Sequence, residues 1–106
     1  MKKTHAIILI IVAALAIRAS AQNSAVKDLY AGKCAVCHAA DGSASTSIGK
    51  SLKIPNFHSS DVQSQSDADL KSMITKGKGA MPTFKGKLTD VQIDQMISYV
   101  RTLGKQ

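Results

Sequence analysis

Three residues that can do chemistry stand together in the segment CAVCH, which runs from Cys34 to His38. Cys34 and Cys37 are the only two cysteines of the 106-residue chain, and His38 follows the second one directly. Thiols and an imidazole at this spacing can form a disulfide, bind a metal ion, exchange electrons as a dithiol, or attach a larger group covalently. The choice among these four chemistries decides what the protein does.

The surrounding sequence argues against three of the four chemistries. A structural zinc site needs four ligands, and no second ligand pair at its own fixed spacing accompanies the cysteines. A thioredoxin-like dithiol follows a strand in a βαβ unit, whereas the residues before Cys34 have a helical pattern. A disulfide across so short a loop stabilises little, and it leaves His38 without a role.

The remaining interpretation is covalent attachment of a c-type haem, which is the chemistry that C-x-x-C-H indicates. Two thiols at this spacing can add to the two vinyl groups on one edge of a porphyrin, and His38 then points its imidazole at the iron. Such a group would also fill the centre of a small domain with a modest aliphatic content. The motif therefore predicts one covalently attached haem c, with its iron.

Met81 is the candidate for the second axial position of that iron. It lies in a glycine-rich loop directly before Pro82, which restricts Met81 to an extended backbone. Met73 and Met96 fall on apolar helix faces, where methionine usually fills a core. His58, in the loop IPNFHSS, is the alternative ligand, and a bis-histidine site has a lower reduction potential than a histidine–methionine site.

The N-terminal segment has the layout of a secretory signal peptide. MKKTH is basic, the apolar run from Ala6 to Ile17 follows, and Ala19-Ser20-Ala21 supplies small residues for cleavage. The run is shorter than the roughly 20 residues of a membrane-spanning helix. Arg18 lies unusually close to the cleavage site, so an uncleaved anchor is the alternative. We expect residues 1–21 to be the signal peptide and residues 22–106 to be the exported domain.

Charge and composition exclude another class of function. The net charge of +7 falls to +4 when Lys2, Lys3 and Arg18 leave with the signal peptide. The remaining chain has no block of lysine or arginine and few aromatic residues, so nucleic acid is not an expected partner. The basic balance favours an acidic protein partner instead.

Helices, and no strand with convincing alternation, are predicted after the signal peptide. The predicted helices are about Ser24–Lys33, a second from Ser66 to Gly77, and a third from Thr89 to Gly104. Thr89 and Gln92 form a capping-box sequence, and Gly104 is a typical helix end. The stretch GSASTSIGKS is expected to be an ordered surface loop.

These residues together resemble the class I c-type cytochromes, in particular the small bacterial and algal forms with one haem. The resemblance rests on CAVCH and on KGKGAMPTFKGKLTDVQIDQMISYVRTL near the C-terminus, and it covers residues 22–106. It implies an all-α fold of three main helices and loops around one haem. It also implies that Cys34 and Cys37 carry the thioether bonds and that His38 and Met81 are the axial ligands.

The resemblance implies further contacts. The first and last helices should cross at near right angles, where Tyr30 meets Tyr99. Val26 stands where the family usually has glycine, so a wider or shifted crossing is expected. A backbone carbonyl from Ile48–Pro55 should accept a hydrogen bond from His38 Nδ1. The residues expected to pack against the haem are Leu52, Ile54 and Met73.

An iron with both axial positions filled exchanges electrons but leaves no open site for oxygen or peroxide. The sequence therefore predicts a monomeric one-electron carrier, and not an enzyme, in the periplasm or an equivalent lumen. Expected partners are redox proteins such as a quinol–cytochrome c oxidoreductase, a terminal oxidase or a photosynthetic reaction centre. The lysines that flank Met81 are candidates for docking an acidic partner or are ordinary solvated surface; they are Lys76, Lys78, Lys85 and Lys87.

Two other classes of function stay open at this point. One is a haem peroxidase or haem sensor that releases Met81 from the iron. The other is a redox or metal module that uses the cysteines without haem.

Overall fold

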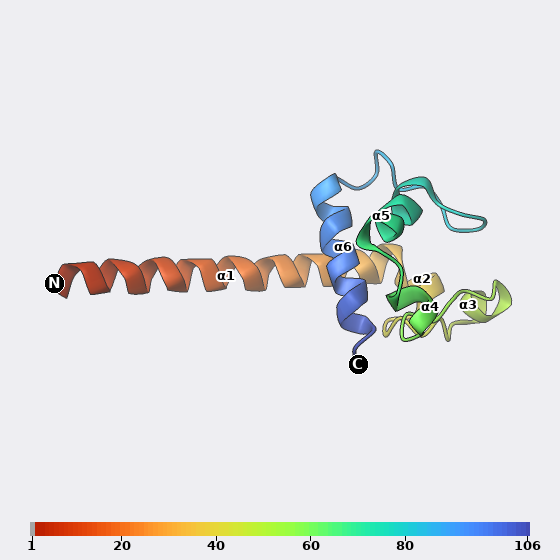
Figure 1. The fold of residues 1–106 in the computed structure, drawn as a ribbon, viewed down its shortest axis with the longest axis horizontal. Coiled ribbons are helices and arrows are strands. Elements are labelled where there is room, and N and C mark those ends of the chain that lie inside the picture. The colour runs from red at the N-terminus through yellow and green to blue at the C-terminus, as the bar shows by residue number, and fades with distance from the viewer. Residues whose placement is uncertain (1) are drawn as a thin grey trace.

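The computed structural model describes residues 2–106, in which six helices and no strand occur (Figure 1). The helices are α1 (Lys2–Lys33), α2 (Ala35–His38), α3 (Ser47–Ser51), α4 (Ser60–Gln63), α5 (Asp67–Lys76) and α6 (Asp90–Leu103). Met1, the first residue of the expected signal peptide, lies outside the described residues. The all-α fold class predicted from the sequence is confirmed.

Helix α1 is longer than the sequence predicted, since it begins at Lys2 and not near Ser24. No proline or glycine interrupts the chain before Gly32, so nothing in the backbone ends a helix between the apolar run and the CAVCH segment. The N-terminal half projects from the rest of the molecule (Figure 1), and its large apolar side chains are 54–71% exposed. Residues Ile7–Lys33 are long and apolar enough to cross a membrane, which is equally true of a signal sequence.

The C-terminal part of α1 crosses α6 (Figure 1), and Tyr30 and Tyr99 meet there. Their ring centroids are 5.1 Å apart at an interplanar angle of 63°, an edge-on arrangement that aromatic pairs favour. Val26, the residue that replaces the usual glycine, is buried in the same cluster with Tyr30, Met96 and Leu103. Its side chain therefore contributes to the core between the two helices.

A second cluster packs α6 against the segment that precedes it. Its buried members are Phe84, Leu88, Ile93 and Ile97. Leu29 of α1 and Ile74 of α5 pack against both clusters, so the two form one continuous core. This shared core joins α1 to α5 and α6, which follow much later in the sequence.

Different interactions define the two ends of α6. At its start the predicted capping box is present: Gln92 N donates to Thr89 Oγ1 (3.1 Å), and Thr89 N donates to Gln92 Oε1 (2.9 Å). At its end Gly104 has φ −65°, a right-handed conformation open to any residue. Glycine leaves room there for the side-chain amide of Gln63, which would have to shift if the residue carried a Cβ.

The stretch GSASTSIGKS contains a short helix, α3, and is not entirely the loop that was predicted. Thr46 caps this helix, since its hydroxyl accepts a hydrogen bond from Gly49 N at 2.9 Å. The boundaries of α5 agree with the prediction: Ser66 Oγ accepts from Asp69 N, and Gly77, with φ 72°, ends the helix.

Tyr30 connects the helix crossing to the end of the CAVCH turn. Its hydroxyl donates a 2.7 Å hydrogen bond to the carbonyl of Ala39. Ala39 has φ 63° and ψ 161°, a conformation that is populated almost only by glycine and costs an L-residue about 1–3 kcal/mol. The buried hydrogen bond helps to hold this unfavourable backbone in place directly after His38.

Replacing Tyr30 with Phe should lower the free energy of unfolding by about 0.5–1.5 kcal/mol at pH 7, because the Ala39 carbonyl loses one of its two donors and keeps only the N–H of Gly42 at 3.2 Å. Burial, with smaller contributions from Cys34, Tyr99 and Asp41, raises the pKa of Tyr30, so the folded state resists ionisation of this phenol. An unfolded tyrosine ionises near pH 10, and the wild-type protein should lose stability as the pH rises above that value. The difference in unfolding free energy between wild type and Tyr30→Phe should therefore shrink between pH 9 and pH 11, roughly the range that brackets the pKa of an unfolded tyrosine. Chemical unfolding across that range measures it, and a constant difference would contradict the explanation.

Candidate haem site

A cavity of about 510 Å³ lies in the part of the molecule that holds the CAVCH turn and the Met81 loop. This volume is within the usual range for a cofactor or ligand site. The cavity brings together every site residue predicted from the sequence: Cys34, Cys37, His38, Leu52, Ile54, Met73 and Met81. Side chains from α2 and from the loop after α5 therefore face one space, although more than forty residues separate them.

The CAVCH turn is fixed by hydrogen bonds from the chain that follows it. Thr46 Oγ1 donates to the carbonyl of Cys37 (3.2 Å), and Ala44 N donates to the carbonyl of His38 (2.9 Å). Gly49 lies so close to this turn that a Cβ there would overlap the carbonyl oxygens of Cys37 and Ala44. The loop and α3 thus hold the backbone carbonyls of the motif while its side chains face the cavity.

The imidazole of His38 is half-buried in the wall of the cavity. Burial lowers the pKa of its imidazole, which favours the uncharged form that binds metals. Nδ1 is buried and has no hydrogen-bond partner among the described residues. The carbonyl expected from Ile48–Pro55 does not reach it, so that prediction is wrong in this structure. Instead the imidazole stacks on Phe57, with centroids 4.7 Å apart at 24°.

Both cysteines are free thiols in the structure. Burial raises the pKa of Cys34 to about 11; Cys37 raises it further, and Lys33 partly opposes the shift. Dithiol exchange and zinc binding both use the thiolate. A Cys34 thiol that stays protonated at neutral pH therefore argues against those two alternatives.

Met81 is presented by a tight turn that is docked on α5. Lys78 and Met81 exchange two backbone hydrogen bonds, of 3.1 and 3.0 Å. The turn follows Gly77, where a Cβ would come within 2.5 Å of the Met81 carbonyl. After it, Thr83 Oγ1 donates to the carbonyl of Thr75 at 2.7 Å, which ties the chain to the last turn of α5. The thioether is therefore held on a constrained loop beside the cavity.

His58, the alternative ligand, does not line the cavity. Its Nε2 is 2.9 Å from the carbonyl oxygen of Asp41, and its backbone N–H donates to Asn56 Oδ1. The imidazole is thus engaged with the surface loop. This placement favours Met81 over His58 as a ligand in the cavity.

All the charged residues that line the cavity are positively charged. Lys33, Lys53 and Lys78 are among its lining residues, and no aspartate is. All three lysines are exposed. Apolar walls with cationic groups at the edge suit a flat apolar group that carries its own carboxylates, as haem does.

Comparisons with known proteins also point to haem. The family model described as cytochrome c oxidase, cbb3-type, subunit III matches residues 21–100. A cytochrome c6 of Leptolyngbya boryana is 38% identical over 72 residues, which are 68% of this chain and 81% of that protein. A cytochrome c6 of Bryopsis maxima is 36% identical over 78 residues, 69% of this chain and 82% of that protein.

The chain belongs to the small class I c-type cytochromes. It also shares 35% identity over 74 residues with a cytochrome c6 of Synechocystis, but it spans only 59% of that protein. Membership implies a covalently bound haem c with its iron, and the structure fits this group. The two free thiols, the neutral His38 with an unpartnered buried Nδ1, and Met81 all lie around one apolar cavity.

Some residues of this cytochrome site were not predicted from the sequence. Phe57 was not expected to contact His38, and Lys33 and Lys53 were not expected beside the cavity. Phe57 is one of only two phenylalanines and follows Pro55 in a loop. That pattern indicates an ordered aromatic, but it does not identify the side chain against which the ring packs.

Replacing Gly49 with Ala should destabilise the haem protein by about 1–3 kcal/mol, because the added methyl group must displace backbone carbonyls of the CAVCH turn. Gly32→Ala is the matched control. Nothing lies within 4 Å of a Cβ at Gly32, and alanine is the better helix former by about 0.5–1 kcal/mol. Chemical unfolding of both variants should give shifts of opposite sign; equal shifts would mean that the fit around Gly49 is looser than described.

Proposed function

We propose that this cytochrome is a one-electron carrier in the periplasm or an equivalent lumen, working between membrane-bound or soluble redox proteins. The observation that carries the proposal is the convergence of Cys34, Cys37, His38 and Met81 on one apolar cavity. The cytochrome c6 relatives support it by name. Haem supplies reversible one-electron exchange at its iron.

In this proposal each site residue has a separate role. Cys34 and Cys37 form thioether bonds that fix the haem to the CAVCH turn. His38 offers Nε2 to the iron, since Nδ1 is the buried nitrogen. Met81 offers its sulfur from the constrained loop. If His38 and Met81 both held the iron, no position would be left on it for a peroxide or oxygen substrate.

The apolar lining residues keep water away from the site. Leu52, Ile54 and Met73 all line the cavity, and we propose that they pack against the haem faces and edge. A low-dielectric environment disfavours the more highly charged oxidised iron, and the neutral thioether acts in the same direction. The chain's own residues thus favour a high reduction potential.

We also propose that residues 1–21 are a signal peptide removed on export, which leaves residues 22–106 as the working protein. The support is the basic, apolar and small-residue order of the segment and its lack of contact with the core. A retained segment would instead tether the cytochrome to the membrane. The mass of the exported protein distinguishes the two forms, because only a chain that begins at Gln22 fits cleavage after Ala21.

One measurement tests haem, ligation and carrier role together: a reduced-minus-oxidised spectrum with a redox titration of the exported protein. Met81→Ala should lose the weak methionine–iron absorption band at the red end of the oxidised spectrum and should lower the midpoint potential. His58→Ala and Met73→Leu serve as controls and should keep the band. Retention of the band in Met81→Ala, or its loss in either control, would show that another residue ligates the iron.

The partners proposed for this carrier are acidic redox proteins, such as a quinol–cytochrome c oxidoreductase or a terminal oxidase. Lys76, Lys78, Lys85 and Lys87 are all exposed, and Lys78 also lines the cavity. The electron would leave from this edge, so cationic side chains around it would steer an acidic partner to the right face.

The pair of substitutions K85Q/K87Q should slow electron transfer to an acidic redox partner about 2- to 10-fold at low salt, because steering charge is lost near the Met81 loop. K27Q/K105Q removes the same charge at exposed positions on α1 and after α6 and should have a smaller effect. The rate of the wild type should fall as ionic strength rises. Stopped-flow kinetics at several salt concentrations measures both effects, and a flat salt profile would assign the lysines to ordinary surface.

A further inference from the structure

Phe57 makes the contact that limits rotation of the His38 ring. The two rings lie nearly parallel, 4.7 Å apart at 24°, and Phe57 is itself part of the cavity wall. A hydrogen bond from Nδ1 would normally fix the plane of a ligating imidazole, but Nδ1 has no partner among the residues described. The stacked face of Phe57 is the aromatic contact that the structure shows against this ring.

Phe57 is in turn held at both ends of its backbone unit. Its N–H donates to the carbonyl of Gly42 at 2.8 Å, and its carbonyl accepts from Gln63 Nε2 at 2.6 Å. A Cβ at Gly42 would lie 2.7 Å from Phe57 Cδ2. The ring is thus fitted closely against Gly42 on one side and against His38 on another.

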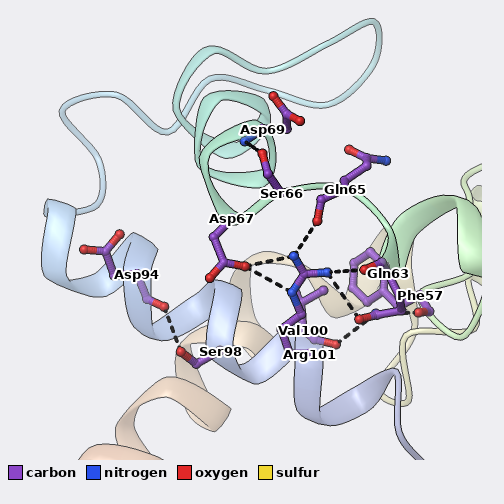
Figure 2. Close-up of polar contacts among 10 residues, drawn as sticks. All are labelled: Phe57, Gln63, Gln65, Ser66, Asp67, Asp69, Asp94, Ser98, Val100 and Arg101. Carbon is purple, nitrogen blue, oxygen red and sulfur yellow. Dashed lines mark hydrogen bonds and ion pairs between the residues drawn. The ribbon is translucent and has the colours of Figure 1, made fainter.

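Gln63 is fixed by Arg101 of α6 in a group of four residues that we name the Arg101 clamp: Gln63, Gln65, Asp67 and Arg101 (Figure 2). Arg101 Nη1 donates to the Gln63 carbonyl at 2.9 Å and to its Oε1 at 3.4 Å. Arg101 Nη2 donates to the carbonyl of Gln65 and, at 2.8 Å, to Asp67 Oδ1. The side chain of Arg101 is 24% exposed, so these bonds are partly shielded from solvent.

We propose that Phe57 is a positioning residue for His38, and that the Arg101 clamp ties the plane of the imidazole to α6. This inference rests on the proposed role of His38 as an axial ligand. The orientation of the imidazole plane over the haem determines how its π orbital overlaps the iron orbitals. A side chain that fixes the plane therefore acts on the electronic state of the iron without touching it.

The test compares Phe57→Leu with Ile93→Val in the exported haem protein. Ile93 of α6 is 1% exposed and packs in the core, but it does not line the cavity. The readouts are the spread of the haem methyl signals in the NMR spectrum of the oxidised protein, the rhombicity of its electron paramagnetic resonance spectrum, and the midpoint potential. Phe57→Leu should change the methyl pattern and the rhombicity and lower the potential, whereas Ile93→Val should lose stability with the methyl pattern kept.

A second pair of variants tests the Arg101 clamp and remains informative if Phe57→Leu does not retain haem. Gln63→Met keeps the length of the side chain but cannot donate to Phe57. It should move the methyl pattern in the same direction as Phe57→Leu, by a smaller amount. Lys71→Met removes the 2.8 Å ion pair to Asp94 between α5 and α6, away from Phe57, and should leave the pattern unchanged.

The outcomes separate this inference from the proposed function. An exported wild-type protein without haem bands overturns the proposed function and the inference with it. Haem bands together with an unmoved methyl pattern in Phe57→Leu and Gln63→Met overturn the inference alone. An equal change in Ile93→Val or Lys71→Met would also overturn it, because the effect would then reflect general loosening of the core.

Discussion

The position of Tyr30 between α6 and the CAVCH turn is the constraint on which the rest of the structure depends. The side chain is 2% exposed, its ring meets Tyr99 edge-on, and its hydroxyl holds the carbonyl of Ala39. Cys34 follows Tyr30 by one helical turn, and its N–H donates to the Tyr30 carbonyl at 2.9 Å. The direction in which α1 packs on α6 therefore also decides where the first thiol lies.

The same helix, α6, fixes the chain on the other side of the motif. Arg101 binds backbone carbonyls of the segment that leads from α4 to α5, and Gln63 passes this constraint to Phe57. The side chain of Asp67 is 74% exposed, so its ion pair with Arg101 adds little stability by itself. The hydrogen bonds from Arg101 to the two backbone carbonyls are the contacts that define the path of this segment. One helix thus positions both the start of the CAVCH turn and the ring that packs on His38.

Local signals in the sequence predicted much of this, and contacts between distant segments explain what was missed. Short sequence signals mark the ends of α5 and α6. The start of α6 is marked by Thr89 and Gln92, and α5 lies between Ser66 and Gly77, so both helices were predicted correctly. CAVCH and Met81 were recognisable because spacing and loop position are local properties. The stack of Phe57 on His38 joins residues nineteen positions apart, and the fit of Gly104 against Gln63 joins residues farther apart still. No periodic pattern encodes such pairs, and the missing acceptor for Nδ1 likewise depends on how a loop folds back.

The fold of the cytochrome domain does not depend on the segment before it. Every side chain before Val26 whose burial is described is exposed, and Val26 is the first buried residue of α1. Removal of residues 1–21 would therefore leave the buried side chains of α1 in place, although it would shorten the helix from 32 residues to the segment 22–33. The shortened helix keeps Val26, Leu29 and Tyr30, which are its links to α6 and to the CAVCH turn. An apolar run that packs on nothing in its own chain is suited to a lipid or translocation environment, where its cost of exposure to water disappears. The core contacts of α1 thus begin after Ala21, the residue after which we propose cleavage.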